Sequence, residues 1–205
     1  MLSWAGWPLE STSSDVDETM LDAEKALDYV CRIARLKCQA DPQGAQTGER
    51  IISADTIVAL DGAILGKPQS AEHAVEMLAA MRGRAHRVMT AVAVRSAGSD
   101  AVRLELCKSH VEMRAYSDEE ISTYVASGDP LDKAGAYAIQ NKAFHPALNF
   151  AGCRACVMGM PLCHLERTLR HDENYEPTDW PAICQKKLEY TCPVTRRIMA
   201  GEDVG

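Results

Sequence analysis

The stretch SADTIVALDGAILGKP, residues 53–68, has the pattern of a β-strand that runs into a turn and then a loop with a lysine. Residues 50–60 are rich in Ile and Val and predict a strand, with Asp61-Gly62 as a turn into residues 63–65. An ionised Asp inside an apolar strand is costly unless it is paired or reaches a ligand at the open end of the strand. Asp55 is therefore either paired with a nearby cation or part of a binding site, and spacing alone leaves both interpretations open.

The segments on either side of this stretch alternate between helical and strand patterns. Helices are predicted where apolar residues recur at helical spacing and where capping residues such as Ser70, or Ser117 with Glu120, precede them. The predicted helices cover residues 22–40, 70–81, 117–127 and 161–170, and the predicted strands cover residues 50–60, 86–94, 102–114 and 135–140. This alternation predicts an α/β fold.

Composition excludes some classes of function. The 205 residues are 46% hydrophobic and 25% charged, as in an ordinary globular protein, and the net charge of −7 argues against a broad surface for nucleic-acid polymers. No apolar run approaches the length of about 20 residues that a membrane helix needs, so no membrane partner is expected. The start, MLSWAGWPLE, lacks the pattern of a secretory signal, and the cytoplasm is the expected location.

Three further groups of polar residues are candidates for chemistry. Asp15, Asp17 and Glu18 precede the first predicted helix, where they serve either as caps or as oxygen ligands of Mg²⁺. Lys67 lies in a Gly-Lys-Pro loop, without a Walker A loop or a G-x-G-x-x-G motif, and such a lysine is commonly just solvated. Gln140 ends the segment GDPLDKAGAYAIQ, residues 128–140, and is either a reader of base edges or a surface residue.

Taken together and in order, these segments resemble one known family. SDVDE, ARLK, SADTIVALDGAILGKP, DEEISTYVASGDPLDKAGAYAIQ and MGMPL resemble the Maf (septum formation) family of nucleoside triphosphate pyrophosphatases over about residues 8–169. The resemblance implies an elongated α/β fold with a mixed sheet, flanking helices and a central cleft, like that of the inosine triphosphate pyrophosphatases. It also implies hydrolysis of a nucleoside triphosphate to the monophosphate and pyrophosphate, assisted by a divalent metal cation, Mg²⁺ or Mn²⁺.

The resemblance assigns expected roles to single residues. Asp55 matches the family's proton acceptor, and Thr56 and Gln140 match positions associated with substrate choice, in the pattern of the branch acting on dTTP and UTP rather than 7-methyl-GTP. Physical reasoning adds that Lys37 and Lys67 neutralise phosphate oxygens, with Lys133 as a further candidate. Glu18 is the expected second carboxylate on the metal side, beside Asp55, and whether Asp55 acts as base or as metal ligand stays open.

The match has one departure at its start. Family members usually begin with a strand leading into S-x-S-P-R-R, and this sequence resembles the family only after that point. We therefore expect the chain as given to be less stable and less active than a chain that carries this strand and its arginine. The alternative function is a catalytically impaired nucleotide-binding or regulatory protein. A homodimer is left open.

The second departure is the cysteine content. Five of the eight cysteines lie in the last 53 residues, at Cys153, Cys156, Cys163, Cys184 and Cys192. They predict a structural metal site, for example for Zn²⁺, although buried and inert cysteines explain the pattern equally well. We expect a domain over residues 1–171 and a polar, irregular extension over residues 172–205. The extension has few large apolar residues, so a metal would pin it to the domain.

Overall fold

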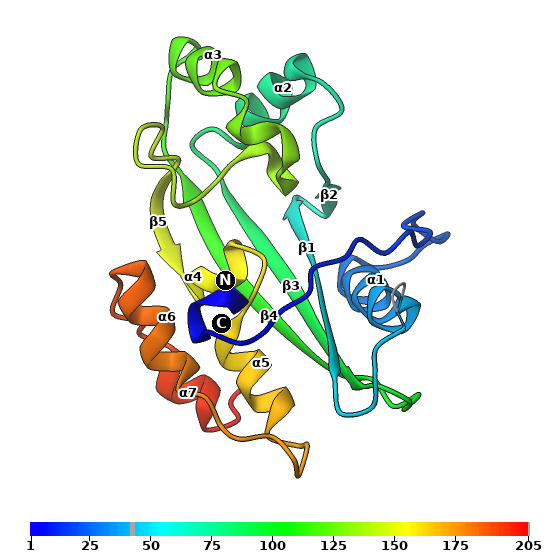
Figure 1. The fold of residues 1–205 in the computed structure, drawn as a ribbon. Helices are drawn as coiled ribbons and strands as arrows, with labels where there is room; N and C mark the ends of the chain where they lie inside the picture. The colour runs from blue at the N-terminus through cyan, green and yellow to red at the C-terminus, as the bar shows by residue number, and fades with distance from the viewer. Residues whose placement is uncertain (42–43, 205) are drawn as a thin grey trace.

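One five-stranded sheet forms the centre of the protein (Figure 1). The computed structural model describes residues 1–41 and 44–204. The sheet order is β2-β1-β3-β4-β5, and every strand pairing in the described residues is antiparallel. The strands are β1 (Arg50–Leu60), β2 (Ala63–Leu65), β3 (Ala85–Ser96), β4 (Arg103–Met113) and β5 (Ala147–Ala151).

The predicted α/β fold with flanking helices is confirmed, but the expected mixed sheet is wrong in its strand directions. Two of the connections are short: Asp61-Gly62 joins β1 to β2, and residues 97–102 join β3 to β4. Short connections return a chain antiparallel to itself, whereas a parallel pair needs a crossover of a dozen or more residues. Two of the four strand pairings, β1 with β2 and β3 with β4, are therefore hairpins.

Helices cover both faces of the sheet and one of its ends (Figure 1). Helix α1 (Ala26–Ala40) packs on one face through Val30, Ala34 and Cys38. The opposite face is covered by α4 (Arg154–Val157), α5 (Leu162–Leu169), α6 (Trp180–Leu188) and α7 (Thr195–Met199). Beyond the end of the sheet lie α2 (Ala71–Met81), α3 (Asp118–Ala126) and the short 3₁₀ helices η2 (Asp129–Asp132) and η3 (Ala134–Ala136).

Strand β3 shows how its sequence divides between these two faces. Met89, Ala91 and Ala93 pack against α1, whereas Val92 and Val94 pack under α5 to α7. The side chains of a strand point alternately to its two faces, so a strand buried on both sides has an almost continuous apolar sequence. The run VMTAVAV accordingly has a single polar member, Thr90, which is fully buried.

Most of the predicted elements are confirmed within a few residues, including the capping box of α3. Ser117 Oγ accepts a hydrogen bond from the Glu120 N–H, and Glu120 Oε2 accepts one from the Ser117 N–H at 2.8 Å. The strand predicted over residues 135–140 is wrong, because Gly135 and Ala136 have left-handed backbone with φ of 72° and 56°. A Cβ at Gly135 would lie 2.8 Å from Val58 Cγ2, so the small residues here allow a tight turn to lie against β1.

The C-terminal segment is folded by apolar burial, and the predicted irregular extension is wrong in this respect. Trp180 and Ile198 are fully buried, in one cluster with residues of β3, β4 and α5. The Trp180 ring meets the Trp7 ring edge to face at 4.9 Å, and the 3₁₀ helix η1 (Leu2–Ala5) packs beside α6. Trp180 and Ile198 are large and completely buried, and further apolar residues of the segment pack partly buried around the same cluster. The division into two units at residue 171 stays a prediction.

None of the helices in the described ranges is long and apolar enough to cross a membrane.

Candidate functional site

A cavity of about 520 Å³ lies along the edge of β1. Strand β3 pairs with β1 over its length, whereas β2 pairs only with Val58–Leu60, so no second described strand pairs with residues 50–57. Adjacent residues of β1 point to opposite faces of the sheet. Asp55, on the face of α1, and Thr56, on the face of α4, consequently both line this one cavity around the strand edge.

Lys37 of α1 joins two carboxylates inside the cavity. Its Nζ lies 2.7 Å from Asp55 Oδ1 and 2.7 Å from Glu18 Oε1. The Asp55 side chain is 11% exposed and that of Glu18 is 51% exposed, so Asp55 lies at the closed side of the cavity and Glu18 at its mouth. Asp55 is therefore paired with a cation and also lines a cavity, and its part in a binding site stays a prediction.

Burial and charge shift the pKa values of this cluster. Burial raises the pKa of the Asp55 carboxyl above its ordinary value, against the lowering effect of Lys37. Burial alone would lower the pKa of Lys37, but the hydrogen bonds to Asp55 and Glu18 raise it on balance. Lys37 thus stays a cation, and the Asp55 carboxylate is a stronger base than a solvated aspartate.

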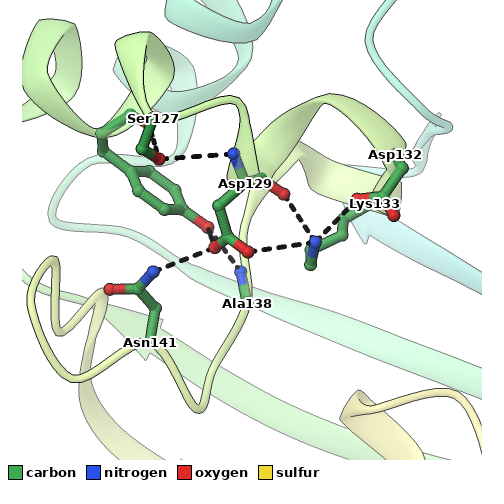
Figure 2. A network of polar contacts seen from close by, with 7 residues as sticks. Ser127, Asp129, Asp132, Lys133, Ala138 and Asn141 are labelled. Atoms are coloured by element: carbon green, nitrogen blue, oxygen red, sulfur yellow. Dashed lines mark hydrogen bonds and ion pairs between the residues drawn. The ribbon is translucent and has the colours of Figure 1, made fainter.

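Lys133 is engaged in a polar network of its own at the other side of the cavity (Figure 2). Its Nζ donates to Asp132 Oδ1 at 2.6 Å and to the Asp129 carbonyl, and forms an ion pair with Asp129 Oδ1 at 3.2 Å. Asp129 in turn accepts hydrogen bonds from Tyr124 and Asn141. Lys133 is therefore neutralised by two carboxylates, which weakens the prediction that it binds phosphate.

Lys67 differs from the other two lysines. It lines the same cavity and forms no ion pair with any of the residues that the structure places. The loop around it is held in position by a backbone hydrogen bond from Gly135 N–H to Gly66 O, at 3.0 Å. A lysine without a carboxylate partner is the most readily available cation for an incoming phosphate.

Thr56 and Gln140, the residues expected to read the base, line the cavity together. Thr56 Oγ1 lies 2.9 Å from Thr90 Oγ1 on β3. Gln140 is exposed, and its side chain has no hydrogen bond to another described residue. Gly159 leaves the Thr56 hydroxyl uncovered, since a Cβ at this position would lie 3.4 Å from Thr56 Oγ1.

Sequence reasoning missed Tyr29, Tyr137 and Thr90. Tyr29 and Tyr137 line the cavity, and Tyr29 donates a hydrogen bond to the Glu18 carbonyl at 3.0 Å. The helical stripe of α1 could have pointed to Tyr29, because this residue lies two turns before Lys37 and on the same side. Thr90 offered a signal as well, since it is the one polar residue in the apolar run of β3.

The cysteines pack together, but they do not form the expected metal site. Cys153, Cys163, Cys184 and Cys192 border a second cavity of about 10 Å³, while Cys156 faces β3 and β4. Among the residues that the structure describes, no three or more His, Cys, Asp or Glu are placed to hold a metal ion together.

The chemistry of these thiols agrees with inert packing. Burial raises the pKa of Cys163 and of Cys184 to about 12, although a hydrogen bond from Cys107 lowers that of Cys153. A metal-binding cysteine must be deprotonated. The structural metal on the five cysteines therefore finds no support in this arrangement of the described residues and stays a prediction. Its motive is weakened, because the C-terminal segment docks through Trp180 and Ile198.

Comparison with known proteins identifies the family of this chain. The model of the family described as Maf-like protein matches residues 1–172. A dTTP/UTP pyrophosphatase of Methylococcus capsulatus is 43% identical over 171 residues, which are 83% of this chain and 84% of that protein. A protein of the same name from Nitrosomonas europaea is 45% identical, over 78% of this chain and 78% of its own length. Another from Geotalea uraniireducens is 40% identical, over 83% of this chain and 87% of its own length. The chain therefore belongs to the family of Maf-like proteins.

Proposed function

We propose that this protein hydrolyses nucleoside triphosphates, with dTTP and UTP as preferred substrates, to the monophosphate and pyrophosphate. One observation carries the proposal: Asp55, a largely buried carboxylate with a raised pKa, faces a cavity of about 520 Å³ that Lys67 also lines, and Lys67 has no ion pair among the residues that the structure describes. The dTTP/UTP pyrophosphatases to which the chain is similar support the choice of reaction and substrate.

The proposed reaction is the attack of water on the α-phosphorus. Asp55 accepts a proton from this water or orients it, and its raised pKa suits a base that works near neutral pH. Lys67, together with Lys37, lies on the cavity wall where it can balance the negative charge that develops on the phosphate oxygens. The bond from the α-phosphorus to the bridging oxygen then breaks, and pyrophosphate leaves.

The residues present fit a divalent cation such as Mg²⁺ or Mn²⁺. Glu18 and Asp55 would hold it, because both direct a carboxylate oxygen at the same point, now taken by Lys37 Nζ at 2.7 Å from each. Hard cations prefer such oxygen ligands and commonly take the remainder from the substrate phosphates and water. A bound cation would neutralise charge on the triphosphate. With Glu18 and Asp55 holding a cation, the Lys37 ammonium would be available to contact phosphate.

Thr56 and Gln140 are proposed to select the base. Both line the cavity away from the Asp55 and Lys37 pair, Thr56 on the opposite face of β1 and Gln140 after η3. A hydroxyl and an amide provide the hydrogen-bonding groups that can distinguish pyrimidine edges. Lys133 is at most an indirect contributor, since Asp129 and Asp132 already neutralise it.

The test is pyrophosphate release from dTTP, UTP, dCTP, CTP, dATP, GTP and 7-methyl-GTP with Mg²⁺ or Mn²⁺. We expect release from dTTP and UTP, and none in excess metal chelator. Preference for 7-methyl-GTP would overturn the choice of substrate. Binding of nucleotide without any pyrophosphate release would favour the alternative of a regulatory nucleotide-binding protein, for which the double pairing of Lys37 offers a reason.

A further inference from the structure

The direction of the hydrogen bonds around Thr90 is fixed by elementary chemistry. Thr90 Oγ1 lies 2.8 Å from the Cys156 carbonyl oxygen and 2.9 Å from Thr56 Oγ1. A carbonyl can only accept, and a hydroxyl has only one hydrogen. Thr90 must therefore donate its hydrogen to Cys156. In the bond between the two threonines, Thr56 is then the donor and Thr90 the acceptor.

The surroundings hold this arrangement in one state. Thr90 and Thr56 are directly opposite each other in the register of β1 and β3, and Thr90 is fully buried. The Cys156 carbonyl also accepts the Gly159 N–H at 2.9 Å, so both of its lone pairs are used. Reversing the bond between the threonines would turn the Thr90 hydrogen away from the Cys156 carbonyl and lose this 2.8 Å hydrogen bond, while the threonine pair would gain none in exchange.

The consequence lies on the cavity side of Thr56. Its only hydrogen is directed at Thr90, so only the lone pairs of Oγ1 remain for a ligand. Gly159 keeps this oxygen uncovered, because its missing side chain would have come within 3.4 Å of it. The Thr56 hydroxyl thus presents an acceptor to the cavity, although a threonine in solution can act either as donor or as acceptor.

We propose that Thr90 is a positioning residue that makes Thr56 an obligatory acceptor, so that the cavity prefers pyrimidines with an N–H at ring position 3 over those with a bare nitrogen there. The inference rests on the proposed function, because it assumes that the base lies at Thr56. Uracil and thymine have this N–H, whereas cytosine, with a ring of the same size, has an acceptor at the same place. Two acceptors facing each other leave both unsatisfied, which corresponds to a preference of about tenfold.

The experiment compares the binding of α,β-imido UTP and α,β-imido CTP, which are not cleaved at the α–β bond, by titration calorimetry. Wild-type protein should prefer the uridine analogue by about tenfold. Thr90→Val keeps the shape but frees the Thr56 hydroxyl to donate, so the preference should fall to about twofold or less. Thr90→Ser keeps the hydroxyl, so it should show the same preference for the uridine analogue as wild-type protein. If Thr90 had only a structural role, Thr90→Val would weaken the binding of both analogues equally, and the ratio of their affinities would stay unchanged.

A test on the ligand needs no variant and covers the case in which Thr90→Val does not fold. UTP methylated at ring nitrogen 3 should bind wild-type protein about as weakly as CTP. Equal binding of UTP, CTP and the methylated UTP would overturn the inference, as would an unchanged ratio in folded Thr90→Val. If wild-type protein releases no pyrophosphate, the hydrolytic function fails, but the ratio of the uncleaved analogues still decides the role of Thr90. Failure to bind either analogue would overturn both proposals.

Discussion

Reactive side chains have opposite surroundings in two regions of the protein: the cavity at β1 and the apolar cluster with cysteines under α5 to α7. At the cavity, Lys37 forms ion pairs with Asp55 and Glu18 beside solvent. Under the C-terminal helices, Cys163 and Cys184 are surrounded by apolar side chains, and burial raises their pKa values to about 12. The first region therefore keeps ion-paired side chains at a cavity, whereas burial keeps the thiols of Cys163 and Cys184 in the second region neutral.

The difference teaches that the grouping of reactive residue types is a weak guide unless their surroundings favour the reactive form. Five cysteines in the C-terminal part of the sequence suggested a metal, but the structure places four of them, all except Cys192, in a cluster with Trp180, Ile198 and other large apolar side chains. The cavity residues come from positions as far apart as Glu18 and Gln140 and nevertheless face one space. Four measurements test this contrast.

The largest effect is expected at Asp55. Asp55→Asn keeps the size of the side chain and removes its charge and basicity, so pyrophosphate release should fall by about 10²- to 10⁴-fold. Folding should persist, because Lys37 keeps Glu18 as a partner. The matched control is Asp100→Asn, in the loop between β3 and β4, which should be as active as wild type. Near-normal turnover in Asp55→Asn would remove Asp55 from the reaction.

The second effect concerns how the C-terminal segment is held. Trp180 is fully buried and packs against Trp7, so Trp180→Ala should lower the free energy of unfolding by about 3–5 kcal/mol. The measurement is urea unfolding, and the control is wild-type protein treated with a strong chelator, which should lose no stability. If the chelator lowered the free energy of unfolding as much as Trp180→Ala does, a bound metal would have to stabilise the cysteine region.

A third effect involves one buried histidine from each region. Burial lowers the pKa of His86, beside the cavity residue Tyr137, and of His164, on α5, to about 4. The unfolded chain, with pKa values near 6.5, binds more protons than the folded chain between these limits, so stability falls as the pH drops from about 6.5 towards 4. Each histidine should cost about 2 kcal/mol of stability at pH 5 relative to pH 7.5. Unfolding of His164→Gln across this range should show a weaker dependence on pH, and an equal slope would contradict the assignment.

The smallest effect is expected at Cys192, the one cysteine at the second cavity that is only partly buried. Cys192→Ser should change the free energy of unfolding by no more than about 0.5 kcal/mol. In wild-type protein, Cys192 should react with a thiol reagent before Cys163 and Cys184, which are buried and have raised pKa values. Mass spectrometry of the partly labelled protein identifies the order, and early labelling of Cys163 would show that this region opens to solvent.

The sequence predicted the regular elements because their signals are local. Ser117 and Glu120 formed the predicted capping box, and the apolar run of residues 86–94 lies inside β3. Strand direction and the turn at Gly135 could not be predicted in the same way. Gly135 and Ala136 have positive φ, and the backbone at Gly135 lies so close to Val58, which is distant in sequence, that a Cβ at Gly135 would come within 2.8 Å of it. The same segment in isolation has the composition of a strand.

By itself, the sequence determined which residues can carry the chemistry of this protein: a carboxylate in an apolar strand, lysines in helix and loop, and a threonine beside that carboxylate. Only the tertiary structure decided which of them are available. It paired Lys37 with Asp55 and Glu18, engaged Lys133 with Asp129 and Asp132, and left Lys67 unpaired among the described residues. It also placed Thr90 behind Thr56, and thereby fixed the direction of a hydrogen bond. The physical reason is that charge, burial and proton direction depend on neighbours in space, which a sequence pattern does not contain.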